Sequence, residues 1–73
     1  MPEFKQIIAC RLKVLRAEAN MSRQDLASAS GVSLDAIGSY ERAEKTPLLE
    51  TTYKLAEALH CTPNDICAFS QEA

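Results

Sequence analysis

The sequence predicts an all-α protein in which five short helices pack around one apolar core. Apolar residues recur at helical spacing along the chain, and no run of Val, Ile and Thr alternates as it would in a strand. Helix breakers are scarce, with 2 glycines and 3 prolines in 73 residues. Because 47% of the residues are apolar and 25% are charged, we expect one globular domain over residues 1–73, with its core at about 4–69.

The first helix is expected over about residues 4–19. Ile8, Leu12 and Leu15 fall on one face of such a helix, which makes that face the buried one. Asn20 follows directly and suits the left-handed conformation in which many helices end.

The second helix is expected over about residues 23–30. Ser22 is its N-cap, and Asp25 stands three residues later, as a capping box requires. Gly31 ends the helix, because glycine adopts a positive φ without steric cost.

The third helix is expected over about residues 34–42. Ser33 is its N-cap, since only two residues separate Gly31 from the helix. Ile37 and Tyr40 give the helix an apolar edge, so we expect Tyr40 to be in the core.

Two more helices follow a linker marked by Thr46-Pro47, because the residue before a proline avoids the helical region. The fourth covers about residues 49–59, and its inner face, with Leu48 nearby, is formed by Thr52, Leu55, Ala56 and Leu59. The fifth is short and has Thr62 as N-cap, Pro63 in its first position and Asp65 in its third. Its inward-facing residues are Ile66 and Phe69.

Residues 23–42 have the spacing of a helix-turn-helix unit. Two helices that cross at about 90–120° after a short turn approach each other closely. Ala27 is small enough to sit at that contact, and Gly31 permits the turn. Ile37 fills the space between the helices, and Val32 closes the corner.

The same stretch resembles a known family. Residues 21–27 (MSRQDLA) are similar to its LSQEELA stretch, and residues 31–33 (GVS) are similar to its turn. The match continues in register at Ile37, Tyr40-Glu41-Arg42, Pro47, Leu49-Glu50-Thr51 and residues 54–59 (KLAEAL). Over about residues 7–67, without a gap, the chain resembles Cro/repressor-type (lambda repressor-like, XRE family) helix-turn-helix proteins of bacteria and phages.

This resemblance implies a compact five-helix DNA-binding domain with residues 34–42 as the recognition helix in the major groove. The positions that would face the bases are Leu34, Asp35, Gly38 and Ser39. The positions that would contact phosphates are Ser22, Arg23, Gln24, Arg42 and Lys45. Arg16 and Glu41 match a buried ion pair that is structural. A homodimer would use residues near 59–69.

The recognition helix departs from the family pattern, because its base-facing positions hold no Arg, Lys, Asn or Gln. Leu34 suits a thymine methyl group, and Asp35 suits the cytosine amino group. Asp35 has a second interpretation, in which it complements the helix dipole. Gly38 either allows a close approach to DNA or a partner, or has no role.

Two further departures concern helix ends. Ala43 replaces a family glycine, so the end of the third helix is expected to differ. Leu48 replaces a common capping serine, so the fourth helix is expected to begin less sharply.

The net charge of −2 and the pI near 5.2 do not by themselves favour nucleic acid. The charge is uneven, however, because residues 1–24 hold five basic and two acidic side chains, a net +3. The overall charge is therefore a weak guide to what one face binds. Two functions stay open: a DNA-binding transcriptional regulator, with repression of operators as its simplest mode, and a protein-interaction module on the same fold, antitoxin-like or unable to read DNA.

Other classes are not expected. The chain has no phosphate-binding loop, no G-x-S-x-G motif and no nucleophile with a base, so we expect neither an enzyme nor a cofactor. Cys10, Cys61 and Cys67 are an odd number with no zinc-site spacing, so reduced thiols are expected and a metal is not. No apolar run is long enough for a membrane span and no signal peptide is evident, so we expect a cytoplasmic protein.

Overall fold

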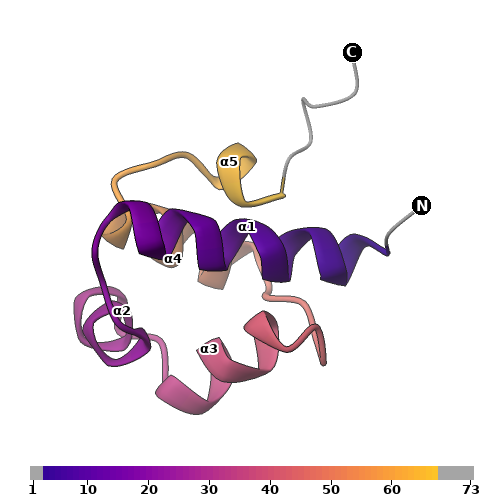
Figure 1. Ribbon diagram of the computed structural model, residues 1–73, viewed down its shortest axis with the longest axis horizontal. Coiled ribbons are helices and arrows are strands. Elements are labelled where there is room, and N and C mark those ends of the chain that lie inside the picture. Colours follow the sequence, from indigo (N-terminus) through magenta and orange to yellow (C-terminus); the bar gives the residue numbers. More distant parts are fainter. Residues whose placement is uncertain (1–2, 68–73) are drawn as a thin grey trace.

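The computed structural model describes residues 3–67, and these residues form an all-helical fold. Its helices are α1 (Phe4–Glu18), α2 (Arg23–Ser30), α3 (Leu34–Glu41), α4 (Leu49–Ala58) and α5 (Pro63–Cys67). In Figure 1, α1 runs across the molecule with α2 and α3 on one side and α5 on the other. The predicted class and helix order are confirmed. Phe69, which was expected to pack inward, lies outside the described residues.

The helices begin where local hydrogen bonds favour a start. The Ser22 Oγ accepts a hydrogen bond from the Asp25 N–H at 3.0 Å, and the Asp25 carboxylate accepts one from the Ser22 N–H at 3.0 Å. This confirms the capping box of α2. At α3, the Ser33 Oγ accepts a hydrogen bond from the Ala36 N–H at 3.1 Å, so Ser33 is the N-cap, as predicted. At α1, the Gln6 side chain accepts a hydrogen bond from the Glu3 N–H at 3.2 Å, which the sequence analysis did not anticipate.

Three helices end in one common geometry. A residue with positive φ follows the C-cap in each: Asn20 (58°), Ala43 (59°) and His60 (58°). After α3, the Ala43 N–H bonds to the Tyr40 carbonyl at 3.2 Å and the Glu44 N–H to the Ser39 carbonyl at 2.9 Å. These two bonds define a Schellman motif, which satisfies carbonyls that the helix leaves unpaired. The expectation for Asn20 is confirmed.

Replacing Ala43 with glycine is expected to stabilise the protein. The left-handed conformation costs an alanine about 1–2 kcal/mol, and glycine adopts it freely. After allowance for the greater freedom of glycine in the unfolded chain, we expect a gain of about 1 kcal/mol and a Tm rise of about 4–8 °C. Thermal unfolding measures this change.

The matched control for this substitution is Ala19→Gly. Ala19 is also an alanine at a helix C-terminus, the C-cap of α1, but its φ is −84°, so glycine offers no conformational advantage there. We therefore expect Ala19→Gly to lower the Tm. A Tm that falls equally in both variants would show that the conformation of Ala43 is not strained.

The core collects side chains from every helix and from the turn between α2 and α3. Its buried members are Ile8, Leu12, Leu26, Val32, Ile37, Tyr40, Leu55, Ala56, Leu59 and Ile66. Ile37 is completely buried, as a residue between two crossing helices should be, and Val32 is buried at the corner. The predicted core position of Tyr40 is confirmed.

One expectation about α4 needs correction. Leu48 was expected near the inner face, but 75% of it is exposed, and as the N-cap of α4 it provides no side-chain hydrogen bond. The dimer surface expected near residues 59–69 stays a prediction, although Leu59 and Ile66 themselves are buried in the monomer core. These two side chains are therefore unavailable to a partner.

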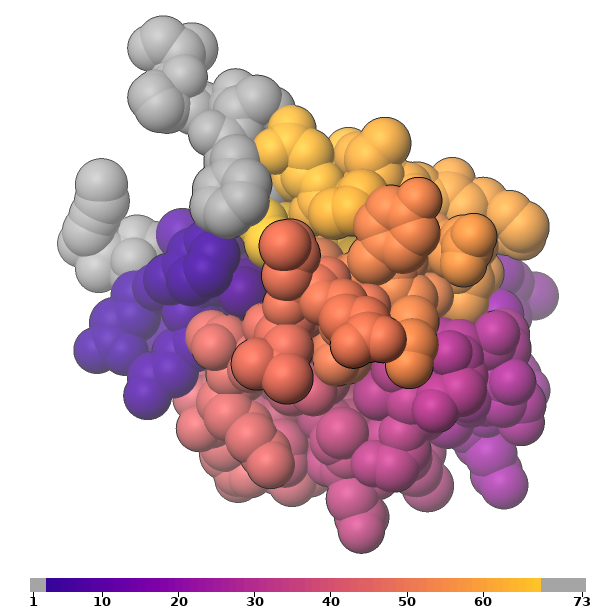
Figure 2. All heavy atoms as spheres, turned by 180° about the vertical axis from the view of Figure 1, so that it is seen from behind, coloured from indigo at the N-terminus to yellow at the C-terminus, as the bar shows by residue number. Residues whose placement is uncertain are grey.

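The three most exposed large apolar side chains among residues 3–67 lie at the start of α4. Leu48, Leu49 and Tyr53 are 75%, 79% and 61% exposed, and Leu49 and Tyr53 stand one helical turn apart. We call these three residues the α4 apolar surface. Figure 2 shows the beginning of α4, in orange, on the outer surface at the front of that view. No helix among residues 3–67 has the length and apolar character to cross a membrane.

Candidate nucleic-acid interface

The start of α3 forms an exposed surface beside the start of α2. Leu34 and Asp35 are exposed, Ser39 is half-buried, and Gly38 is buried. A surface cleft of about 660 Å³ lies between the two helices, and its lining residues are Arg16, Ser22, Arg23, Gln24, Leu34, Asp35, Gly38 and Arg42. The structure thus brings together three of the four expected base-facing residues and four of the five expected phosphate-contacting residues. Ser39 and Lys45 do not line the cleft.

An ion cluster lies behind this surface. The Arg16 Nε donates a hydrogen bond to the Glu41 Oε2 at 2.8 Å, and the Arg16 Nη2 donates one to the Oε1 at 3.1 Å. The Arg23 Nε donates a third bond to the same Oε1 at 3.0 Å. The Glu41 side chain is completely buried, whereas Arg16 and Arg23 are 20% and 43% exposed. One carboxylate therefore joins α1, α2 and α3.

The electrostatics of Glu41 follow from this geometry. Burial on its own raises the pKa of the Glu41 carboxyl, because it disfavours the charged form. The hydrogen bonds and charges of Arg16 and Arg23 outweigh burial, so the pKa of Glu41 lies below its ordinary value. The cluster consequently holds a buried carboxylate in its ionised state.

Arg23 belongs both to the cleft and to the ion cluster. It was expected to contact phosphate, and it lines the cleft, but it also pairs with Glu41. The sequence did not indicate this pairing, because the two partners lie on different helices and are 18 positions apart in the chain. With 43% of its side chain exposed, Arg23 remains accessible to an anion while it is paired.

The start of α2 offers backbone donors. The first intrahelical hydrogen bond here runs from the Leu26 N–H to the Ser22 carbonyl, so the N–H groups of Arg23 and Gln24 precede it. The Ser22 hydroxyl is already engaged as the cap. N–H groups at a helix N-terminus favour an anion, which suits the expectation of phosphate contact here.

Arg42 is the C-cap of α3 and folds back along that helix. A Cβ atom built on Gly38 would lie 2.9 Å from the Arg42 Nη1, so the guanidinium occupies the space over the glycine. The Arg42 Nε also donates a hydrogen bond to the Glu44 carboxylate at 3.0 Å. The hydrogen bond from Arg42, followed by its charge, lowers the pKa of Glu44.

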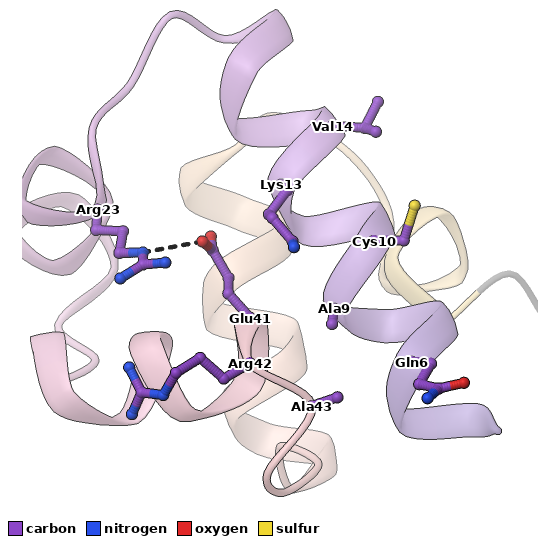
Figure 3. Close-up of a pocket in the computed structure, with 9 residues that line it drawn as sticks. All are labelled: Gln6, Ala9, Cys10, Lys13, Val14, Arg23, Glu41, Arg42 and Ala43. Carbon is purple, nitrogen blue, oxygen red and sulfur yellow. Dashed lines mark hydrogen bonds and ion pairs between the residues drawn. The ribbon is translucent and has the colours of Figure 1, made fainter. Parts of the chain in front are cut away.

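A second cleft, of about 690 Å³, lies between α1 and the end of α3. Figure 3 shows Arg23 reaching Glu41 from one side and Lys13 extending from α1 toward the same region. Lys13, Arg23 and Arg42 all line this cleft. Lys13 was not among the expected site residues.

The described residues provide no evident metal site. Within residues 3–67, no three His, Cys, Asp or Glu side chains gather as metal ligands would. Cys10, Cys61 and Cys67 are free thiols, and burial raises the pKa of both Cys61 and Cys67.

Comparisons with known proteins agree with this geometry. A family model described as helix-turn-helix matches residues 12–66. An uncharacterised HTH-type transcriptional regulator of Archaeoglobus fulgidus is 34% identical over 62 residues, which are 85% of this chain and 87% of that protein.

Two crystal structures are also similar. One, an HTH_3 family transcriptional regulator from Vibrio cholerae, has a TM-score of 0.84 and 33% identity; the match covers 94% of this chain but only 38% of that one. The other, the restriction-modification controller protein C.AhdI from Aeromonas hydrophila, has a TM-score of 0.81 and 31% identity. That match covers 85% of this chain and 94% of C.AhdI.

Proposed function

The chain belongs to the helix-turn-helix family whose model matches residues 12–66, and from this membership we propose that it is a sequence-specific DNA-binding transcriptional regulator. Its α3 enters the major groove of operator DNA, and the start of α2 contacts the adjacent phosphates. Repression by blocking RNA polymerase is the simplest mode of action. The proposed location is the cytoplasm, where such a protein meets DNA, and no catalysis is proposed.

One observation carries the proposal. The exposed residues at the start of α3 and the first residues of α2, whose N–H groups precede the first intrahelical hydrogen bond, line the same cleft. A DNA duplex bound there would contact both helices at once. The ion cluster around Glu41 fixes the two helices relative to α1, which makes this surface rigid before DNA binds. A rigid, preformed surface avoids the entropic cost of ordering on binding.

We propose further that the protein acts as a homodimer through the α4 apolar surface. Soluble monomers rarely leave a contiguous cluster of large apolar side chains exposed. A two-fold axis brings the same surface of two copies together and buries it. Leu48, Leu49 and Tyr53 are the most exposed large apolar side chains among residues 3–67. Leu48 and Leu49 are consecutive, and Tyr53 stands one helical turn after Leu49.

Selection from a random pool of DNA duplexes at low salt tests the function. We expect an inverted repeat whose half-sites are about one helical turn, or 34 Å, apart. Contacts to phosphate from Arg23 and Lys45 in both copies should neutralise four charges. The logarithm of the binding constant should then fall against the logarithm of salt concentration with a slope of about −3.6.

The control for this selection is the circular dichroism spectrum of the same sample. If the protein is helical and yet enriches no motif, then α3 does not read DNA. That result would favour the alternative, a protein-interaction module on the same fold, and a pull-down would then seek the partner.

A further inference from the structure

We propose that Arg42 is the specificity-determining residue of α3. Its guanidinium occupies the space that a side chain at Gly38 would fill, and from there it donates hydrogen bonds to a guanine. The inference rests on the proposed function. It assigns to Arg42 the contact between a cationic side chain and a base that the four expected base-facing residues cannot make. Leu34, Asp35, Gly38 and Ser39 hold no side chain with the donor geometry that guanine requires. Arg42 provides that geometry.

Gly38 makes the back-folded position of Arg42 available. The guanidinium lies where a side chain at residue 38 would begin, with its Nη1, Cζ and Nη2 at 2.9, 3.6 and 3.7 Å from a Cβ built there. The φ of Gly38 is not positive, so the backbone conformation does not require glycine. Glycine within a helix destabilises it relative to alanine. Space for Arg42 is therefore what Gly38 provides.

The position of the guanidinium places it on the face of α3 that is expected to meet the bases. Arg42 stands four residues after Gly38 and seven after Asp35, so the three share one helix face. All three line the cleft beside α2, together with Leu34. The pKa of Arg42 is raised, first by its hydrogen bond to Glu44 and to a smaller extent by the charge of Asp35. Asp35 thus has a cation near it, which reduces its repulsion of the phosphates.

The chemistry of arginine suits this position. A guanidinium donates two parallel hydrogen bonds to the O6 and N7 of guanine in the major groove, and no other side chain does so as frequently. In the free protein, Arg42 pairs with Glu44, but both side chains are about half exposed. Exposed ion pairs contribute little to stability, so exchanging Glu44 for guanine costs little.

The test compares motifs selected from random duplexes by the wild type and by Arg42→Gln. We expect the wild-type motif to contain a guanine in each half-site, and Arg42→Gln to lose the preference at that position. Discrimination against the other bases should fall about 10- to 100-fold there, with the other positions unchanged.

Lys45→Gln is the matched control, because Lys45 is a neighbouring exposed cation that does not line the cleft. It should keep the wild-type motif and weaken binding equally for all sequences, with a shallower salt dependence. If Arg42→Gln behaves in the same way as Lys45→Gln, Arg42 contacts only phosphate and the inference is wrong.

Gly38→Ala is the second variant, and it keeps the fold because alanine favours a helix. Its added Cβ displaces the Arg42 guanidinium, so the same guanine preference should weaken although Arg42 itself is intact. An unchanged motif in Gly38→Ala would contradict the role of the back-folded position. The proposed function fails separately, if the wild type selects no motif at all.

Discussion

Replacing Glu41 with glutamine is expected to lower the free energy of unfolding by about 3 kcal/mol, which corresponds to a fall in Tm of about 12–24 °C. Glutamine has nearly the same shape, but it offers one oxygen and an NH₂ group where Arg16 and Arg23 need two acceptor oxygens. The loss stands at the low end for a broken buried ion pair, because the two arginines retain access to water. Thermal and urea unfolding measure it.

The matched control is Glu44→Gln. Glu44 also pairs with an arginine, but the pair is exposed to solvent, and exposed pairs contribute little. We expect the Tm of this variant to stay close to that of the wild type. Equal losses in the two variants would mean that burial of Glu41 has no special consequence.

The effect of Glu41→Gln depends on pH in a defined direction. Because the folded-state pKa of Glu41 lies below its ordinary value of 4.5, folding favours the ionised form, and this stabilisation is present above about pH 4.5. It is lost as the pH falls through the folded-state pKa. The stability difference between wild type and Glu41→Gln should therefore stay constant from neutral pH to about pH 4.5 and shrink as the pH falls further.

Measuring a difference removes the contribution of the other carboxyl groups. The pKa values of Asp25 and Asp65 are also lowered, each by hydrogen bonds to its own capping residue, but both groups are present in both proteins. A difference that stays constant from pH 7 to pH 3 would show that the charge of Glu41 is not the source of the stabilisation.

Replacing Leu49 with glutamate is expected to raise the dissociation constant of the proposed homodimer about 100-fold. Burying a leucine side chain contributes about 1.5–3 kcal/mol, and a two-fold interface contains each substitution twice. Two carboxylates that face each other across the axis add repulsion. Sedimentation equilibrium measures the dissociation constant, and a gel-shift assay with the selected inverted repeat should show the same loss of affinity.

Leu49 suits this test because the substitution should not harm the monomer. It is the first residue of α4 and largely exposed, and an acidic residue is favourable at a helix N-terminus. Val14→Glu is the control, since Val14 is an exposed apolar residue on α1, outside the α4 apolar surface. If Val14→Glu dissociates the dimer and Leu49→Glu does not, the interface lies elsewhere; a monomeric wild type would rule out the homodimer itself.

Much of the fold could be predicted from the sequence, because helix boundaries depend on neighbours three or four residues apart. The capping box of Ser22 and Asp25, the left-handed Gly31 and the pairing of Thr62 with Asp65 are all local, and all are present. Each of the first four predicted helices agrees with the structure to within about one residue at its ends. Resemblance to a family then implied the compact DNA-binding domain and the surface expected to meet DNA.

The tertiary structure decided those contacts between helices that neither local patterns nor the resemblance indicated. Arg23 meets Glu41 because α2 and α3 cross, and no local pattern encodes that distance. The packing of α4 left Leu48 outside and Leu59 inside, although both are leucines at the ends of one helix. Arg42 covers Gly38 because a long side chain at a helix end folds toward available space. The sequence by itself determined the elements through short-range hydrogen bonds and periodicity, whereas side-chain partners depended on how the helices pack.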